Sequence, residues 1–265
     1  MIIECKKFAK KWKKECKGTH ARLAIVQVGD NPASNAYIKG KIKDCEEVGF
    51  SFSLHKWPED VLEEDLIGYI NQLNNDKAVN GIIVQLPLPA HLDTDKIVNT
   101  VAIEKDVDGF RPGSPYVPCT PLGIVRLLDE MEINVEGKMV VILGRSQYLG
   151  KKAFELLLNK NATLAVCHSK TPLELRDELL AKADIIISAV GKAGLFTVDH
   201  IKENAIVIDV GINRTTDGKL VGDFVPSDKK EITYTPVPGG VGLITRAMLL
   251  QNTLSAYHTQ NTNAD

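Results

Sequence analysis

The stretch MVVILGRSQYLG at residues 139–150 decides the fold. Its first five residues are all apolar, as expected for a strand that is buried on both faces of a parallel sheet. Gly144 and Gly150 then bound a G-x-S-x-x-x-G loop that opens a helical pattern. In doubly wound α/β sheets such a loop binds phosphate, because glycine lets the backbone approach and the helix N-terminus points unpaired N–H groups at the anion.

Short apolar runs alternate with helical patterns on both sides of this stretch. Such alternation is typical of βαβ units, which build parallel sheets covered by helices. We therefore predict strands at residues 23–28, 51–57, 81–86, 139–143, 162–167, 185–189 and 205–210, and helices at residues 34–48, 62–73, from about 149, 172–181 and 243–257.

A segment rich in Gly and Pro, residues 106–121, separates the two series of elements. A chain of 265 residues suits two modest domains, and we place their boundary near Cys119. A helical pattern at residues 123–131 follows the boundary, and the last helix can pack back on the first domain.

Composition narrows the class of partner. The chain has 32 Lys and Arg against 34 Asp and Glu, a net charge of -2, so it lacks the broad basic surface that nucleic acid or an anionic membrane would need. No segment approaches membrane-spanning length, and the lysines of residues 6–14 are interpreted as a solvated helix face. A small-molecule substrate is the better default.

The five cysteines are odd in number and far apart, without the paired spacing of a zinc site or a disulfide framework. We therefore expect reduced thiols in the cytoplasm and no bound metal.

The residues around the glycine loop favour NADP over NAD. Arg145 can meet a phosphate, and the next predicted strand ends in His168, Ser169 and Lys170, where NAD sites usually place Asp or Glu. An acidic residue there would repel a 2′-phosphate. A serine-hydrolase elbow is disfavoured, because three residues rather than one follow Ser146 before the glycine, and His168 receives no catalytic role.

The predicted helix at residues 34–48 carries a candidate proton-transfer group. Ile38, Cys45 and Val48 belong to its apolar stripe. Viewed down the helix axis, Lys41 lies between Cys45 and Val48 and so on the edge of this stripe. Burial would lower the pKa of Lys41 toward a value useful for proton transfer. Tyr37 shares its face. The alternative is a lysine whose stem packs on the core while its ammonium stays in water, beside a packing tyrosine.

Two further polar groups stand where open α/β sheets bind ligands. Gln85 lies at the C-terminal end of the strand predicted at residues 81–86 and could orient Lys41 or a substrate carbonyl. Asp108, in the loop DVDGF, could accept two hydrogen bonds from an amidine-like heterocycle edge, although the loop could also be a simple turn.

Taken together, these segments closely resemble the bifunctional methylenetetrahydrofolate dehydrogenase/methenyltetrahydrofolate cyclohydrolase family. The matching strings run in the family's order from about residue 23 to residue 246: VGDNPASNAYIKGK, GIIVQLPLP, KDVDGF, PCTPLG, GRSQYLG, CHSKT, ADIIISAVGK, VIDVGINR and TPVPGGVG. The resemblance implies an N-terminal α/β substrate domain, residues 1–118 completed by residues 243–258. A Rossmann-like, doubly wound parallel-sheet NADP domain at residues 119–242 follows, with a cleft between the two domains.

The resemblance also implies the chemistry. Hydride transfer from 5,10-methylenetetrahydrofolate to NADP gives the methenyl compound, which water then opens to 10-formyltetrahydrofolate. The implied catalytic residues are Lys41, Tyr37, Gln85 and Asp108. Tetrahydrofolate derivatives would contact Tyr37, Lys41, Gln85, Leu86, Asp108, Pro238, Gly239 and Gly240, and NADP would contact Gly144, Arg145, Ser146, Ser169 and Ile212. A homodimer is implied as well.

The sequence departs from the family pattern near both sites. Residues 111–117 form a shortened connection that could open one wall of the folate pocket, and Leu149, Lys151 and Lys152 change the end of the phosphate loop. Three alternatives therefore stay open: a cyclohydrolase with weak or lost dehydrogenase activity, a noncatalytic folate-binding protein, and an NADP dehydrogenase for an amino-acid or shikimate-like substrate.

Overall fold

The computed structural model describes residues 1–262, and the chain divides into two compact units. Unit 1 comprises Met1–Ala9 and Thr120–Thr245, and unit 2 comprises Lys10–Cys119 and Arg246–Asp265. The first residues belong to unit 1 because Ile3 N donates to Tyr234 O (2.8 Å) and Tyr234 N donates to Met1 O (3.0 Å). The functional division expected from the sequence instead groups them with residues 10–118.

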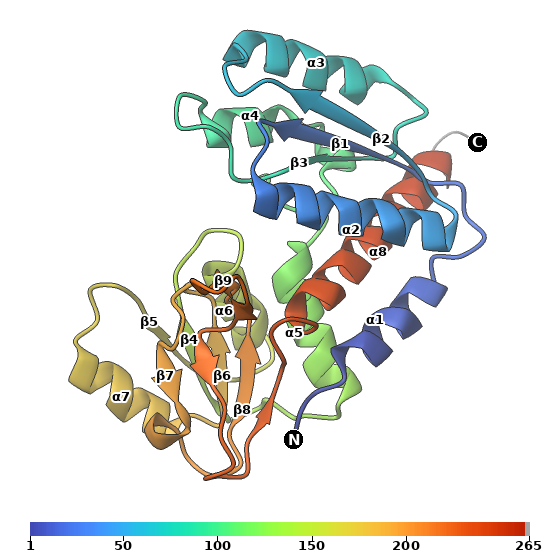
Figure 1. Cartoon of the computed structure of the whole chain (residues 1–265). Helices are drawn as coiled ribbons and strands as arrows, with labels where there is room; N and C mark the ends of the chain where they lie inside the picture. The colour runs from blue at the N-terminus through green and yellow to red at the C-terminus, as the bar shows by residue number, and fades with distance from the viewer. Residues whose placement is uncertain (263–265) are drawn as a thin grey trace. The chain divides into compact units, whose positions relative to one another are not determined.

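Unit 1 is built on a five-stranded parallel sheet in the order β12-β8-β6-β4-β5 (Figure 1). Counted along the chain, these strands stand in the order 2-1-3-4-5, one of the two common orders of doubly wound sheets. The predicted α/β fold with a doubly wound parallel sheet is therefore confirmed. The strands are β4 (Met139–Leu143), β5 (Thr163–Cys167), β6 (Ile185–Ser188), β8 (Ile206–Asp209) and β12 (Thr233–Tyr234).

The core of unit 1 forms because alternate residues of the apolar strands face one layer of packing. Val141 and Leu143 of β4, Ile186 of β6 and Val207 of β8 pack with Leu180 of helix α7. The helices are α5 (Cys119–Glu130), α6 (Gly150–Leu158), α7 (Leu173–Lys182) and η2 (Val198–His200), and short strands at β7 (Phe196–Thr197), β9 (Asn213–Arg214), β10 (Leu220–Val221) and β11 (Phe224–Val225) complete the unit.

Unit 2 contains a three-stranded parallel sheet in the order β2-β1-β3. Figure 1 shows helices α2 and α3 on opposite faces of this sheet. On one face, Ala24 and Val26 of β1 pack with Leu66 and Ile70 of α3. The elements are β1 (Arg22–Val28), α2 (Pro32–Val48), β2 (Ser51–Trp57), α3 (Glu63–Asn75), β3 (Gly81–Val84), α4 (Thr94–Thr100), η1 (Ile103–Lys105) and α8 (Val241–Thr262).

The last helix packs on unit 2 from residue 246 onward, as the sequence suggested. The Asn252 side chain donates to Val107 O (2.9 Å) and Val117 O (3.0 Å), so α8 clamps both ends of the loop that carries Asp108. Near its end, Gln260 Nε2 donates to Asn80 O (2.9 Å). None of the described helices is both long and apolar enough to cross a membrane.

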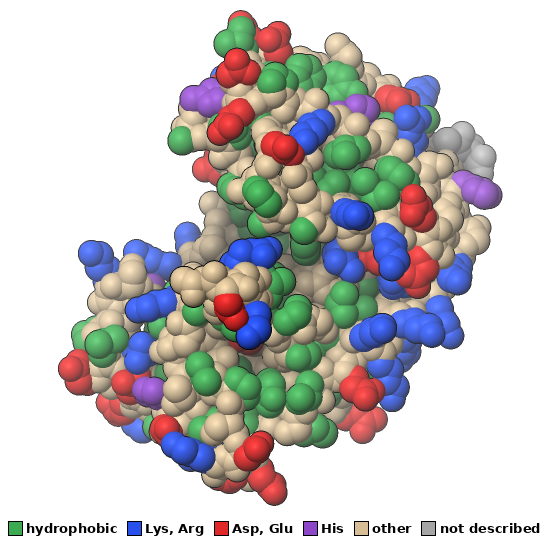
Figure 2. Space-filling view, viewed as in Figure 1, with side chains coloured by type: hydrophobic (Ala, Val, Ile, Leu, Met, Phe, Trp, Pro, Cys, Tyr) green, Lys and Arg blue, Asp and Glu red, His purple; other side chains and the backbone are tan. Residues whose placement is uncertain are grey.

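The first helix, α1 (Cys5–Lys14), is less solvated than predicted. Figure 2 shows lysine and arginine side chains gathered over α1, and Lys6, Lys7, Lys10, Lys11 and Lys14 are indeed exposed. However, Trp12 is fully buried, and Lys13 keeps only 14% of its side chain exposed and pairs with Asp44 (3.0 Å) and Glu47. Helix α1 is therefore only partly solvated, because one of its faces packs in the core.

Candidate active site

Helix α2, which belongs to unit 2, carries Tyr37 and Lys41. The Asn31 side chain caps the helix by accepting hydrogen bonds from Ala33 N (2.9 Å) and Ser34 N (3.1 Å), and Pro32 stands in the first turn, where its missing N–H costs nothing. Gly49 ends the helix with φ 87°, a left-handed conformation that glycine adopts without strain. The cap thus sets the helical register that buries Lys41, which is only 6% exposed.

The structure brings Lys41, Gln85 and Tyr37 together. Lys41 Nζ donates to Gln85 Oε1 at 3.1 Å and lies 5.1 Å from the centre of the Tyr37 ring, within cation–π range. Gln85 follows the carboxyl end of β3, which stops at Val84 and not at residue 86 as predicted. The Gln85 amide donates to Leu86 O (2.7 Å), and this bond turns the amide oxygen toward Lys41. Leu86 therefore bears on the site through its backbone.

Asp108 stands in a loop that is shaped by its neighbour, Asp106. The Asp106 carboxylate is 3% exposed and accepts hydrogen bonds from Arg111 N (2.9 Å) and Phe110 N (3.3 Å). Gly109 has φ 69°, and a Cβ there would lie 2.5 Å from Tyr116 O, so only glycine fits. These contacts give the DVDGF loop a defined conformation. They also hold it against the short connection formed by residues 111–117.

Two opposing effects act on the ionisation of Asp108. Burial raises its pKa to about 6, while the positive charge of Lys41 works against that rise. Asp108 is thus close enough to Lys41 to feel its charge, and it can change protonation near neutral pH. A carboxylate, a buried amine and an amide oxygen in one unit can accept hydrogen bonds from a ligand and move a proton.

Sequence reasoning missed the groups that hold this arrangement. Asp44, three residues after Lys41, accepts from Arg246 Nε (2.6 Å) and Lys13 Nζ (3.0 Å), and Asn252 clamps the Asp108 loop. A Cβ at Gly40 would lie 2.4 Å from Arg246 Nη1, so glycine leaves room for the arginine. These partners are far apart in the chain, and no local pattern links them.

In unit 1 the glycine loop follows β4 at the point where the strand order reverses. Such switch points are where doubly wound sheets bind ligands. Gly144 has φ 113°, and a Cβ there would lie 2.7 Å from Ala189 O, at the end of the neighbouring strand β6. A Cβ at Gly150 would lie 2.3 Å from Gly144 O. The two glycines therefore let the loop fold tightly onto the start of α6.

A cavity of about 490 Å³ opens beside this loop, at the carboxyl ends of β4, β5 and β6. Three of the residues expected to contact NADP, Gly144, Arg145 and Ser169, line it together with the cations Arg176 and Lys192. Among the described residues that line it there is no Asp or Glu. This concave, cationic site next to a helix N-terminus fits a phosphorylated nucleotide with an additional 2′-phosphate.

The other predicted contacts lie around this region or apart from it. Ser146 Oγ accepts from Gly150 N (3.4 Å) and supports the loop without lining the cavity. Ile212 lines a separate cavity of about 70 Å³ together with Pro238, Gly239 and Gly240. The structure thus groups these four residues with one another rather than with the cationic cavity.

A buried carboxylate, Asp223, holds one wall of the cationic cavity. It accepts hydrogen bonds from Val190 N (2.9 Å), Gly191 N (3.3 Å), Lys192 N (2.8 Å) and Ser188 Oγ (2.8 Å). Sequence reasoning assigned no role to this position. Its role could not be predicted from the local pattern, because these four donors stand more than thirty residues earlier in the chain and, among the described residues, only Asn213, which donates at 3.1 Å, is nearer.

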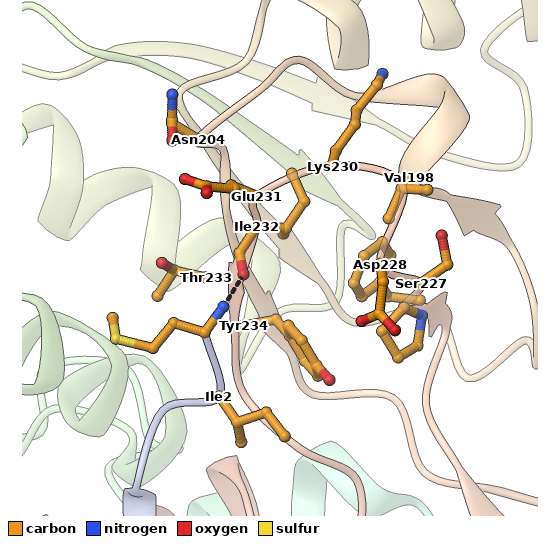
Figure 3. A pocket seen from close by; sticks show the side chains of 13 residues that line it. Ile2, Val198, Asn204, Ser227, Asp228, Lys230, Glu231, Ile232, Thr233 and Tyr234 are labelled. Atoms are coloured by element: carbon orange, nitrogen blue, oxygen red, sulfur yellow. Dashed lines mark hydrogen bonds between the residues drawn. The ribbon is translucent and has the colours of Figure 1, made fainter.

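A second cavity of unit 1, about 710 Å³, is a poor candidate for the nucleotide (Figure 3). Its lining includes Asn204 and Thr233, at the amino-terminal ends of β8 and β12, whereas open α/β sheets bind ligands at the carboxyl ends. Asp228 and Glu231 also line it, and the terminal ammonium of Met1 donates to Ile232 O there. The charges of these two acids offset those of Lys230 and the Met1 ammonium, so the described lining of this cavity lacks the excess of positive charge found in the cationic cavity.

Known proteins match nearly the whole chain. The family model "Tetrahydrofolate dehydrogenase/cyclohydrolase, catalytic domain" matches residues 3–108, and "Tetrahydrofolate dehydrogenase/cyclohydrolase, NAD(P)-binding domain" matches residues 118–261. A Bacillus thuringiensis relative, "Bifunctional protein FolD", is 47% identical over 245 residues, which cover 88% of this chain and 85% of the relative.

Solved structures agree with this assignment. A Campylobacter jejuni structure, titled bifunctional enzyme FolD, methylenetetrahydrofolate dehydrogenase/cyclohydrolase, is 42% identical with a TM-score of 0.92 and covers 98% of this chain and 99% of its own. A Trypanosoma brucei methylenetetrahydrofolate dehydrogenase-cyclohydrolase, solved with NADP and an inhibitor, is 33% identical with a TM-score of 0.91 and covers 98% of this chain and 97% of its own. The chain therefore belongs to the tetrahydrofolate dehydrogenase/cyclohydrolase family.

Proposed function

We propose that this protein oxidises 5,10-methylenetetrahydrofolate to the methenyl compound with NADP and then hydrolyses that compound to 10-formyltetrahydrofolate. The observation that carries the proposal is the hydrogen bond of 3.1 Å between the buried Lys41 ammonium and Gln85 Oε1. A buried amine that is held by one neutral acceptor keeps further N–H groups for a ligand and is suited to proton transfer.

In the hydrolytic step, water attacks the electrophilic methenyl carbon and forms a new C–O bond. Lys41 moves the proton that this water must lose and returns one to the ring nitrogen as the C–N bond breaks. Gln85 positions Lys41, and Tyr37 packs beside the amine and offers its ring to the folate. Asp108, once ionised, accepts hydrogen bonds from the amidine-like edge of the pteridine.

For the oxidative step, unit 1 supplies the nucleotide site. Bound there, NADP would supply the hydride acceptor for the methylene carbon. The loop of Gly144, Arg145 and Ser146 and the cavity wall at Ser169 hold the phosphates through backbone N–H groups and a guanidinium. The cationic lining supports a retained dehydrogenase activity over a cyclohydrolase that has lost it. We also assign Ile212 to the cofactor, and Leu86, Pro238, Gly239 and Gly240 to the folate.

The test is a spectrophotometric assay of the purified chain with 5,10-methylenetetrahydrofolate and either NADP or NAD, followed in the same cuvette by hydrolysis of the methenyl compound. We expect NADP-dependent oxidation followed by hydrolysis. Hydrolysis without oxidation would contradict the dehydrogenase half of the proposal. Folate binding without either reaction would favour a noncatalytic protein.

We extend the proposal to the setting of the enzyme. The five cysteines are buried and free, which supports a reducing compartment such as the cytoplasm. The functional division would be a folate domain of residues 1–118 with 243–258 and an NADP domain of residues 119–242. The assembly would be a homodimer, which light scattering would reveal as twice the 29.1 kDa mass of one chain.

A further inference from the structure

Arg176 lines the cationic cavity of unit 1 but belongs to none of the motifs that identified the nucleotide site. It stands in the first turns of α7, where its backbone N donates to Pro172 O at 3.0 Å. Only 16% of its side chain is exposed, although it carries a full positive charge. Burying a charged guanidinium costs free energy unless the charge is paired, so the partners of Arg176 have to be identified.

The pairing of Arg176 is incomplete. Its Nε donates to Asp177 Oδ1 at 2.8 Å, and its Nη2 lies 2.6 Å from the same oxygen. Within residues 1–262, Nη1 donates no hydrogen bond, so two N–H groups of the fork are available. Asp177 therefore occupies one edge of the guanidinium and fixes its plane, while the other edge can serve an anion.

The position of Arg176 indicates which anion this is. The same cavity is lined by Cys167, His168 and Ser169, at the carboxyl end of β5, the second strand of the doubly wound unit. In dinucleotide folds the group that reads the ribose 2′ position follows this strand. The charge of Arg176 also reaches Cys167, since it partly offsets the rise that burial causes in the thiol pKa.

We propose that Arg176 is a second specificity-determining residue for NADP, which binds the 2′-phosphate from the α7 side of the cavity while Arg145 and Ser169 bind it from the loops. The inference rests on the proposed use of NADP and deepens it. A guanidinium fork matches phosphate oxygens in a bidentate manner, so it favours the phosphorylated ribose over the free hydroxyl. None of the described lining residues is acidic, and Asp177, the carboxylate that pairs with Arg176, does not line the cavity.

The test compares two fragments by calorimetry: 2′,5′-ADP, which carries the 2′-phosphate, and 5′-AMP, which lacks it. For Arg176→Gln we expect the affinity for 2′,5′-ADP to fall about ten- to a hundredfold, as for loss of a charged hydrogen bond, and the affinity for 5′-AMP to change less than about twofold. Arg176→Lys keeps the charge without the fork and should show an intermediate loss. The matched control is Lys182→Gln on the same helix, whose side chain is 64% exposed and outside the cavity.

Several outcomes would overturn the inference. An equal loss for both fragments would assign Arg176 to the adenine or to the stability of α7, and no loss for either would make it a bystander. Unchanged binding of 5′-AMP by Arg176→Gln serves as the folding check, because that fragment uses unit 1, where Arg176 lies. Wild-type protein that binds 5′-AMP as tightly as 2′,5′-ADP would contradict the proposed NADP preference itself, which is a different failure from an unchanged Arg176→Gln variant.

Discussion

Lys41 combines near-complete burial with a hydrogen bond to a neutral amide oxygen. Replacement by Met keeps the aliphatic stem but removes the amine. We expect Lys41→Met to lower hydrolysis of the methenyl compound by about 10²- to 10⁴-fold, as for loss of a general acid–base group. Binding of NADP should persist, because its cavity lies in unit 1.

The matched control for this variant is Lys43→Met, two residues further along the same helix, where the side chain is exposed. The measurement is the initial rate of methenyl hydrolysis, with circular dichroism to verify folding. A Lys41→Met enzyme that hydrolyses at the rate of Lys43→Met would remove Lys41 from the chemistry.

We expect Asp108 to make folate binding depend on pH. Its pKa of about 6 lies above the ordinary value of 3.8, so the stability that this group contributes is fully present below about pH 4 and is lost as the pH rises through about 6. The affinity for folate changes with pH in the opposite direction to the stability, because only the ionised carboxylate accepts two hydrogen bonds. We expect the affinity for a non-reacting folate analogue to rise as the pH passes through about 6.

Fluorescence titration of the analogue at several pH values would check this expectation. The Asp108→Asn variant, which cannot ionise, should bind more weakly and show no inflection near pH 6. If the inflection survives in Asp108→Asn, another group is responsible for it.

Helix α2 is held in place by ionic contacts to α8 and α1 at the Asp44 carboxylate. Asp44 keeps 7% of its side chain exposed, and its partners Arg246 and Lys13 keep 20% and 14%. Asp44→Asn would leave these cations without a counter-charge. We expect a loss of about 2 to 4 kcal/mol in the free energy of unfolding, somewhat below the usual cost for a fully buried pair because both cations retain some water.

Urea unfolding of Asp44→Asn would measure this loss, with Glu46→Gln on an exposed position of the same helix as control. Because Lys41 lies one turn before Asp44, hydrolysis should weaken along with stability. Equal urea midpoints for the two variants would show that the contacts of Asp44 do not stabilise the fold.

The two units of the whole molecule should respond to different ligands. Amide hydrogen exchange with NADP alone should slow in residues 144–150 and 167–176 of unit 1, since ligand contacts suppress local opening. A folate analogue alone should slow exchange in residues 37–41 and 106–110 of unit 2. Protection by NADP confined to unit 2 would contradict the assignment of the cationic cavity.

Much of this architecture is predictable from the sequence, because short stretches of neighbouring residues determine most of the helices and strands. The strands at residues 51–57 and 139–143 agree with their predicted bounds, because polar and apolar residues alternate at the start of the first and the second is a short apolar run that ends at a glycine turn. The edge strand β12, two residues long, was missed because so short a segment has no period. Its pairing with β8 and with the first residues of the chain depends on the rest of the sheet.

By itself, the sequence determined the parallel α/β class, the glycine loop and the partial burial of Lys41, because each follows from the spacing of a few neighbouring residues. For Gln85 the sequence offered Lys41 or a substrate carbonyl as partner, and the tertiary structure shows the bond to Lys41 across 44 positions. Only the tertiary structure decided that Asp223 would hold one wall of the cationic cavity and that Arg176 would line it. Periodicity encodes which face of an element is buried, whereas the partner that this face meets is set by strand order and loop closure across the whole chain.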